Sequence, residues 1–187
     1  MAINPYTIST DPEDLSIIPG VRFAAVVNGC PRALGRPVFR HNPAIPARRN
    51  QIRVVNPTRR FQLAMRAIIV DDIGQEPHPF FDNASGGVTV NLSFFMPRPN
   101  CHFFPDRPRL YENLRPKFKH FNLNHVVRPD IDNLVKFVLD LPLTGTVFGD
   151  DKLVVKLNVA KKYDSVGDCQ GRTKIEVLAN TINLVNA

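Results

Sequence analysis

The sequence predicts an α+β fold: a single compact domain with a small mixed sheet and helices packed on one of its faces. The chain has 187 residues, which suits one domain. It is 43% hydrophobic and 22% charged, so it can bury a core and is not disordered by composition. Segments with strand periodicity and segments with helix periodicity are interspersed along the chain, without an internal repeat.

The first half of the chain predicts one strand and one long helix. We expect residues 1–19 to form an N-terminal tail and residues 20–187 to form the folded domain. The apolar, β-branched run over 21–27 predicts a strand that ends at the turn signal Asn28-Gly29. Residues 32–40 predict an extended loop or a second strand, and 41–58 a connection rich in proline and arginine. Apolar residues at helical spacing after Arg59 predict a helix that ends at Gly74.

The second half predicts three further strands and one short helix. Residues 88–96 alternate between apolar and other side chains, as in a half-buried strand. A basic, aromatic insertion at about 97–127 follows, and a loop of that length is usually functional or mobile. A helix is expected to start near Asp132 and to end at Pro142. Strands are expected over 153–160 and 174–179.

Charge and cysteine content restrict the classes of partner and compartment. Lysine and arginine number 24 against 17 acidic residues, which gives a net charge of +7 and favours an anionic partner. The apolar run Phe23–Val27 is far too short to span a membrane, and residues 1–20 have no secretory signal pattern. Three widely spaced cysteines without a CxxC pair support neither a disulfide framework nor a cysteine zinc site. We therefore expect an intracellular protein with reduced thiols.

Two pairs of aspartates are the strongest candidates for chemistry. Asp130 and Asp132 flank the predicted start of a helix, and Asp150-Asp151 follow that helix and a glycine-containing turn. We expect the return loop to bring the second pair beside the first. Converging carboxylates repel each other unless a hard cation such as Mg²⁺ lies between them, and such a site suits phosphodiester hydrolysis. Lys136 lies one helical turn after Asp132 and can neutralise a phosphate.

These patterns also have simpler explanations. Lys136 and Asp132 have the spacing of an ordinary surface ion pair. A D-x-D pair also caps helices, binds Ca²⁺, or holds Mn²⁺ in glycosyltransferases. From spacing alone the alternatives stay open.

The whole stretch from Arg128 to Asp140, RPDIDNLVKFVLD, resembles the core motif of the RusA family of Holliday junction resolvases. The continuation GTVFGDD at 145–151, Lys161-Lys162-Tyr163, and the opening segment VNGCP with Gly35-Arg36-Pro37 are also similar to that family. Pro129 stands where some relatives have a basic residue, and the 97–127 insertion is longer than in compact members.

The resemblance implies a small homodimeric endonuclease that depends on Mg²⁺, with Mn²⁺ as a possible substitute. It implies resolution of four-way DNA junctions by paired symmetric nicks in recombination and repair. Asp130, Asp132 and Asp151 fall on the family's metal-binding aspartates, Asp150 on the neighbouring acid and Lys136 on the catalytic lysine. We expect the branched DNA to be contacted by basic residues on several segments: Arg32, Arg36, Arg40, Arg128, Lys161 and Lys162.

Two other functions fit parts of this sequence. A non-catalytic junction-binding or nucleic-acid-binding protein on the same scaffold would keep the basic surface without cutting DNA. A D-x-D glycosyltransferase explains the aspartates, but it needs a larger nucleotide-sugar domain and leaves the basic surface unexplained.

Overall fold

The computed structural model describes residues 7–8, 21–36, 38–41, 52–73, 87–119 and 124–180. The strands are β1 (Thr7–Ile8), β2 (Val21–Asn28), β3 (Val38–His41), β4 (Ile52–Val55), β5 (Val88–Met96), β6 (Val154–Tyr163) and β7 (Arg172–Ala179). The α-helices are α1 (Arg59–Ile73), α2 (Pro116–Lys119) and α3 (Ile131–Val138). Four short helical segments are η1 (Asn100–His102), η2 (Tyr111–Asn113), η3 (Leu139–Leu143) and η4 (Asp151–Leu153). Within these ranges no helix is long and apolar enough to span a bilayer.

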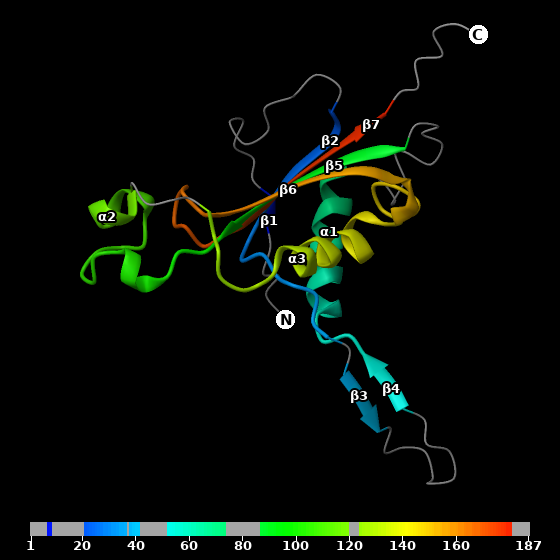
Figure 1. The fold of residues 1–187 in the computed structure, drawn as a ribbon, viewed down its shortest axis with the longest axis horizontal. Coiled ribbons are helices and arrows are strands. Elements are labelled where there is room, and N and C mark those ends of the chain that lie inside the picture. The colour runs from blue at the N-terminus through cyan, green and yellow to red at the C-terminus, as the bar shows by residue number, and fades with distance from the viewer. Residues whose placement is uncertain are drawn as a thin grey trace, which may run out of the picture.

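A mixed five-stranded sheet forms the centre of the molecule (Figure 1). Its strand order is β1-β2-β7-β5-β6. β7 pairs antiparallel with both β2 and β5, whereas β6 runs parallel to β5 at the edge. A separate two-stranded hairpin, β3-β4, extends away from the sheet (Figure 1). The α+β class and the mixed sheet are confirmed.

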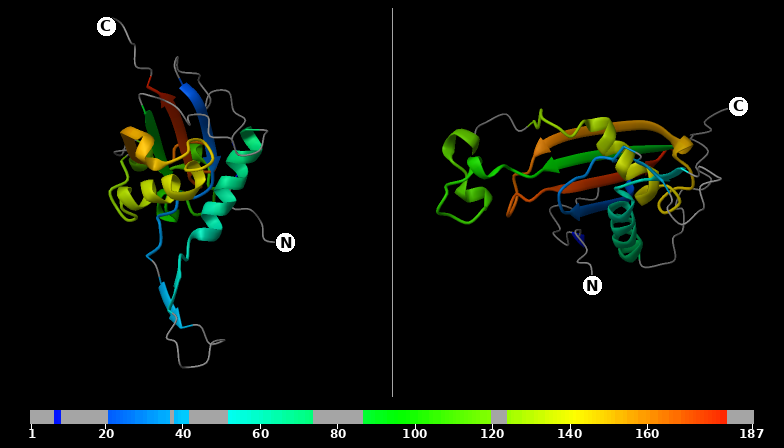
Figure 2. Two further views of the ribbon diagram at one scale, coloured as in Figure 1. Left: turned by 90° about the vertical axis from the view of Figure 1, so that its right-hand side faces the viewer. Right: turned by 90° about the horizontal axis from the view of Figure 1, so that it is seen from below.

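The hydrophobic core lies between one face of the sheet and helices α1 and α3 (Figure 2). Along β5 every second side chain is buried, from Val88 to Met96, because alternate residues of a strand point to the same face. Met65 and Ile69 of α1 and Leu134 and Phe137 of α3 pack into the same cluster. The helices therefore cover one face, as the sequence predicts.

Pro142 does not end the helix, contrary to our expectation. α3 continues into η3, a π-helical turn that contains Pro142. In a π-helix the nitrogen of residue 142 would donate to the carbonyl of Phe137, but proline has no N–H. The buried Gln62 of α1 supplies the missing donor, because its Nε2 lies 3.1 Å from that carbonyl oxygen. The wider turn and the side-chain donor together accommodate the proline.

Two short strands were missed from the sequence. β4 lies inside the segment predicted as a connection, where its partner β3 makes strand pairing possible. Thr7 and Ile8 of the predicted tail form β1 and pair with Asn28 and Val27. Other parts of the 1–19 and 41–58 segments lie outside the described residues.

Residues 97–119, which we call the arm, project beyond the end of β5 (Figure 1). The arm has a small core of its own, in which Phe103 and Leu114 pack with Cys169 from the β6–β7 loop. His102 stacks on Phe118 at 3.9 Å between ring centroids, and its ring edge faces Tyr163 of β6. The predicted irregular insertion is thus a packed structure over its described residues.

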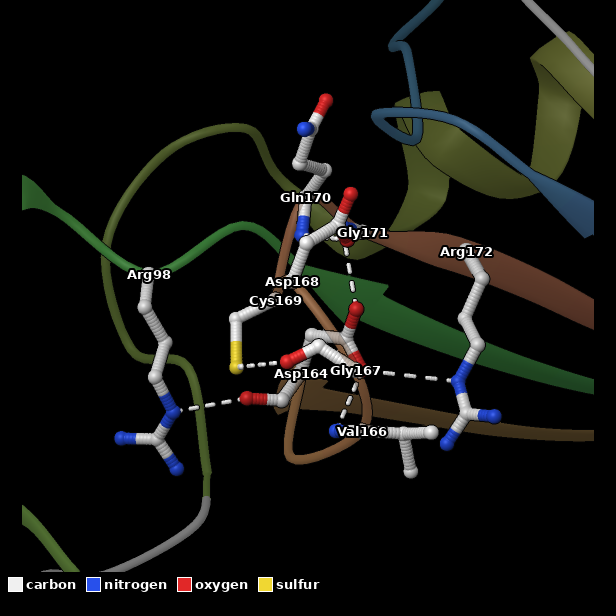
Figure 3. A network of polar contacts seen from close by, with 9 residues as sticks. All are labelled: Arg98, Asp164, Val166, Gly167, Asp168, Cys169, Gln170, Gly171 and Arg172. Atoms are coloured by element: carbon white, nitrogen blue, oxygen red, sulfur yellow. Dashed lines mark hydrogen bonds and ion pairs between the residues drawn. The ribbon is translucent and has the colours of Figure 1, made fainter. Parts of the chain in front are cut away.

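A polar network ties the arm to the β6–β7 loop (Figure 3). Arg98 Nε donates to the Asp164 carbonyl oxygen at 2.6 Å, and its own backbone N–H donates to the Cys169 carbonyl oxygen at 3.1 Å. The Asp164 carboxylate accepts the Gly171 N–H and forms an ion pair with Arg172 at 3.4 Å. Burial raises the pKa of the Cys169 thiol to about 11. All three cysteines are free thiols, as expected.

Candidate active site at the start of α3

Asp130 and Asp132 stand at the exposed N-terminus of α3. Asp130 is the N-cap residue, with extended backbone angles, and its side chain makes no capping hydrogen bond. Asp132 lies in the first turn. Negative side chains are favourable at this end because the helix dipole is positive there. Both carboxylates reach solvent, so a cation or a water molecule can approach them.

The segment before Asp130 is held against β6. Lys161 Nζ donates to the carbonyl oxygens of Val127 at 2.9 Å and Pro129 at 2.7 Å. The His125 N–H donates to the Lys161 carbonyl oxygen at 3.1 Å. Lys161 is one of the residues expected to contact DNA, and its ammonium group also donates two hydrogen bonds to the backbone that leads into Asp130.

Lys136 lies 4.0 Å from Asp132, with both side chains more than 60% exposed. An exposed pair at this spacing contributes only a few tenths of a kcal/mol. Its value to the fold is therefore small, and the ammonium group is accessible to a ligand.

Asp140 was not singled out from the sequence, although it continues the four-residue spacing of Asp132 and Lys136. Burial raises its pKa, and the negative charge of Asp151 raises it further, while Lys136 lowers it. Asp151 therefore lies within electrostatic reach of Asp140, and Asp140 within reach of Lys136. Together these residues connect the start of α3 with η4.

Asp150 and Asp151 differ in their surroundings. Asp150 caps η4: its carboxylate accepts the Lys152 N–H at 3.0 Å and pairs with the Lys152 ammonium group at 3.2 Å. The backbone hydrogen bond from Lys152 is the main cause that lowers the Asp150 pKa. Asp151 is exposed and begins η4. Asp151 is thus the better cation ligand of the two.

The two aspartate pairs do not form one closed group in this structure. Within the described ranges, no three His, Cys, Asp or Glu side chains are close enough together to hold one metal ion. Like charges repel when no cation lies between them. The donor chemistry of Asp130, Asp132 and Asp151 nevertheless fits Mg²⁺, which prefers carboxylate oxygens and keeps several of its waters.

A basic loop lies against the same helix. The Leu34 N–H donates to the Asn133 carbonyl oxygen of α3 at 2.9 Å. The loop thereby brings Arg32 and Arg36 toward the candidate site. Arg32 stacks over the Phe61 ring at 3.7 Å, and Arg36 is exposed.

The remaining residues predicted to contact DNA are dispersed. Arg128 and Lys162 are exposed on the segment before α3 and on β6. Arg40 lies in β3, opposite Arg53 of β4, and its side chain is outside the described residues.

Comparison with known proteins decides the family. The model of the endodeoxyribonuclease RusA family matches residues 34–177, which is most of the chain. The chain belongs to the RusA family. A search of curated proteins finds no match. Membership in RusA makes this a protein of a nuclease family whose substrate is branched DNA, and it confirms the resemblance carried by the 128–163 stretch.

The RusA match spans every aspartate and lysine of the candidate site. It also spans the arm and the basic loop from Leu34 onward, whereas Arg32 lies just before the matched range. The family thus covers both the acidic residues and most of the surrounding basic surface.

Proposed function

We propose that this RusA protein is a Mg²⁺-dependent endonuclease that resolves four-way DNA junctions by paired nicks. The main support is the family match over the segment that presents Asp130, Asp132, Lys136 and Asp151. Exposed carboxylates beside a basic loop suit a reaction in which an anionic backbone must approach an acidic site.

In this proposal Asp130, Asp132 and Asp151 would hold the cation, whose charge would offset their mutual repulsion and draw the two aspartate pairs together. When bound there, Mg²⁺ would supply an attacking water of lowered pKa and positive charge next to the scissile phosphate. Lys136 neutralises a non-bridging phosphate oxygen, and Arg36 orients the backbone on the other side. Asp150 keeps its capping role at η4 and helps to position Asp151.

A second copy of the chain completes the enzyme, because two strands of a junction must be cut in a coordinated way. We place the contact at the first half of β6, where, among the described residues, Val155 is 62% exposed and Leu157 is 40% exposed at the edge of the sheet. An apolar strand at a sheet edge favours pairing with another chain. Val155→Glu with Leu157→Glu should convert a dimer to a monomer in analytical ultracentrifugation, whereas Lys156→Glu should not.

The function is tested with a labelled four-way junction, with and without Mg²⁺. The wild type should yield symmetric nicks only when Mg²⁺ is present. Asp132→Asn should abolish product and retain junction binding, because it removes a candidate metal ligand and leaves the basic surface unchanged. Asp71→Asn, which changes an exposed acid at the end of α1, serves as the matched control and should cut normally. Binding without product in the wild type would instead establish a non-catalytic junction-binding protein.

A further inference from the structure

The arm is rich in positive charge. Its basic residues, Arg98, Arg107, Arg109, Arg115, Lys117 and Lys119, outnumber its acidic residues, Asp106 and Glu112. This segment therefore carries a large part of the net positive charge of the chain. The site at α3 makes no use of these residues, so their role needs a separate account.

Most of these basic side chains have structural partners. They donate to main-chain carbonyl oxygens: Arg98 to Asp164 at 2.6 Å, Arg109 to Arg98 at 2.8 Å, Arg115 to Phe103 at 2.9 Å and Lys119 to Glu112 at 2.7 Å. Buried or partly buried carbonyls need donors, so Arg98, Arg109 and Arg115 help to hold the shape of the arm. The bond from Lys119 is exposed but occupies its ammonium group.

Arg107 and Lys117 differ from the other four. Both are exposed, and among the described residues their contacts are with aromatic rings. Arg107 Cζ lies 4.9 Å from the centroid of Phe104, and Lys117 Nζ lies 4.9 Å from that of Phe118. A ring restricts the cation's side-chain freedom without neutralising its charge. Both cations are thus held in place yet remain available to an anion.

The position of the arm indicates which part of the DNA it can reach. It lies at the opposite end of β6 from η4 and Asp151 (Figure 1). The ten residues of β6 span about 30 Å, equivalent to about nine base pairs of duplex. This span separates the arm from Asp151, whereas the segment before Asp130 is held at Lys161, near the arm end of β6. Because the arm projects beyond that end (Figure 1), we expect a contact on it to fall on a duplex arm of the junction and not at the point of strand exchange.

Resting on the function proposed above, we propose that the arm is a second DNA-binding surface on which Arg107 and Lys117 contact phosphates of one duplex arm of the junction. The packing of the arm against the β6–β7 loop keeps this surface at a fixed distance from α3. Two contacts of this kind add affinity independently of base sequence, because phosphates carry no sequence information.

The test measures junction binding without Mg²⁺, so that the DNA stays intact. Arg107→Gln with Lys117→Gln should weaken binding and reduce by about two the magnitude of the slope of log K against log salt concentration. The wild type should therefore bind more tightly than the variant, by a factor that is about tenfold smaller at 200 mM than at 50 mM salt. The matched control, Arg107→Lys with Lys117→Arg, keeps both charges and should bind like the wild type.

The length of the duplex arms of the DNA junction shows where on the DNA the contact lies. On a junction whose hairpin-capped arms have about six base pairs, the wild type and the double Gln variant should bind equally. Equal binding of the two proteins on long-armed junctions, with wild type still binding and cutting, would overturn this inference alone. If the double Gln variant lost the same affinity on short-armed and long-armed junctions, the contact would lie at the exchange point and not on a duplex arm. A wild type that binds no junction would instead contradict the proposed function.

Discussion

Lys161 Nζ lies 2.7 Å from the carbonyl oxygen of Pro129, the residue that immediately precedes Asp130. A second hydrogen bond, to Val127 at 2.9 Å, fixes the same segment. The position of a candidate metal ligand thus depends on a lysine from β6, a strand that is distant in sequence.

Lys161→Met should therefore slow cleavage more than it weakens junction binding. Without the two hydrogen bonds the backbone before Asp130 can shift, and a displacement of about 1 Å costs about a hundredfold in rate. Single-turnover cleavage and equilibrium binding separate the two effects, and Lys161→Arg should restore part of the rate because it keeps the donors. The neighbouring exposed Lys162 is the matched control: Lys162→Met should weaken binding and lower the salt slope by about one. The same binding phenotype at Lys161 would mean that it contacts DNA instead.

Gln62→Leu should destabilise the protein by about 1–3 kcal/mol. The substitution leaves the Phe137 carbonyl oxygen without its 3.1 Å donor, and it also removes the acceptor of the Asn56 amide. Urea denaturation measures the loss. Gln170→Leu, at an exposed position, should change the free energy of unfolding by less than about 0.5 kcal/mol. A neutral Gln62→Leu would show that the π-helical turn satisfies this carbonyl in another way.

Gly87→Ala should cost more stability than Gly145→Ala. Both glycines have positive φ, at +71° and +72°, so alanine is strained by about 1 kcal/mol at either site. At Gly87 the added Cβ would lie 2.5 Å from Val155 Cγ1 and 2.8 Å from the Leu153 carbonyl oxygen, whereas at Gly145 nothing lies within 4 Å. Thermal unfolding compares the two variants, and equal shifts would mean that β6 moves aside at no cost.

The protein should lose stability as the pH falls below the ordinary histidine pKa of 6.5. Burial lowers the pKa of His102 and His125, and the nearby cations Arg98 and Lys161 lower them further. The unfolded chain then binds more protons than the folded one between the two pKa values, so the free energy of unfolding rises with pH in that window. Denaturation at pH 5.5 and 7.5 measures the slope. Replacing both histidines by phenylalanine should flatten it, and an unchanged slope would assign the effect to other groups.

The strands and helices with strong periodicity were predictable, and the connections were not. The alternation from Val88 to Met96 and the helical spacing after Arg59 gave β5 and α1 correctly, because each is set by local residues. β4 has no strong pattern of its own and depends on pairing with β3. Pro142 was misjudged because its accommodation requires Gln62, a residue on another helix.

Candidate residues for the site could be proposed from the sequence, whereas their contacts could not. The aspartates and Lys136 could be named from spacing and family resemblance, because residue type alone indicates a possible ligand. The commitment of Lys161 to Pro129 and the proximity of Asp140 to Asp151 arise from tertiary packing. No local sequence pattern encodes either contact.

The central place of β7 in the sheet has a consequence for biosynthesis. β7 is the last strand along the described chain, yet it separates β2 from β5. Neither of those earlier strands can complete its ladder until β7 itself has left the ribosome. A product truncated before Arg172 would therefore leave β2 and β5 without their shared neighbour in the sheet.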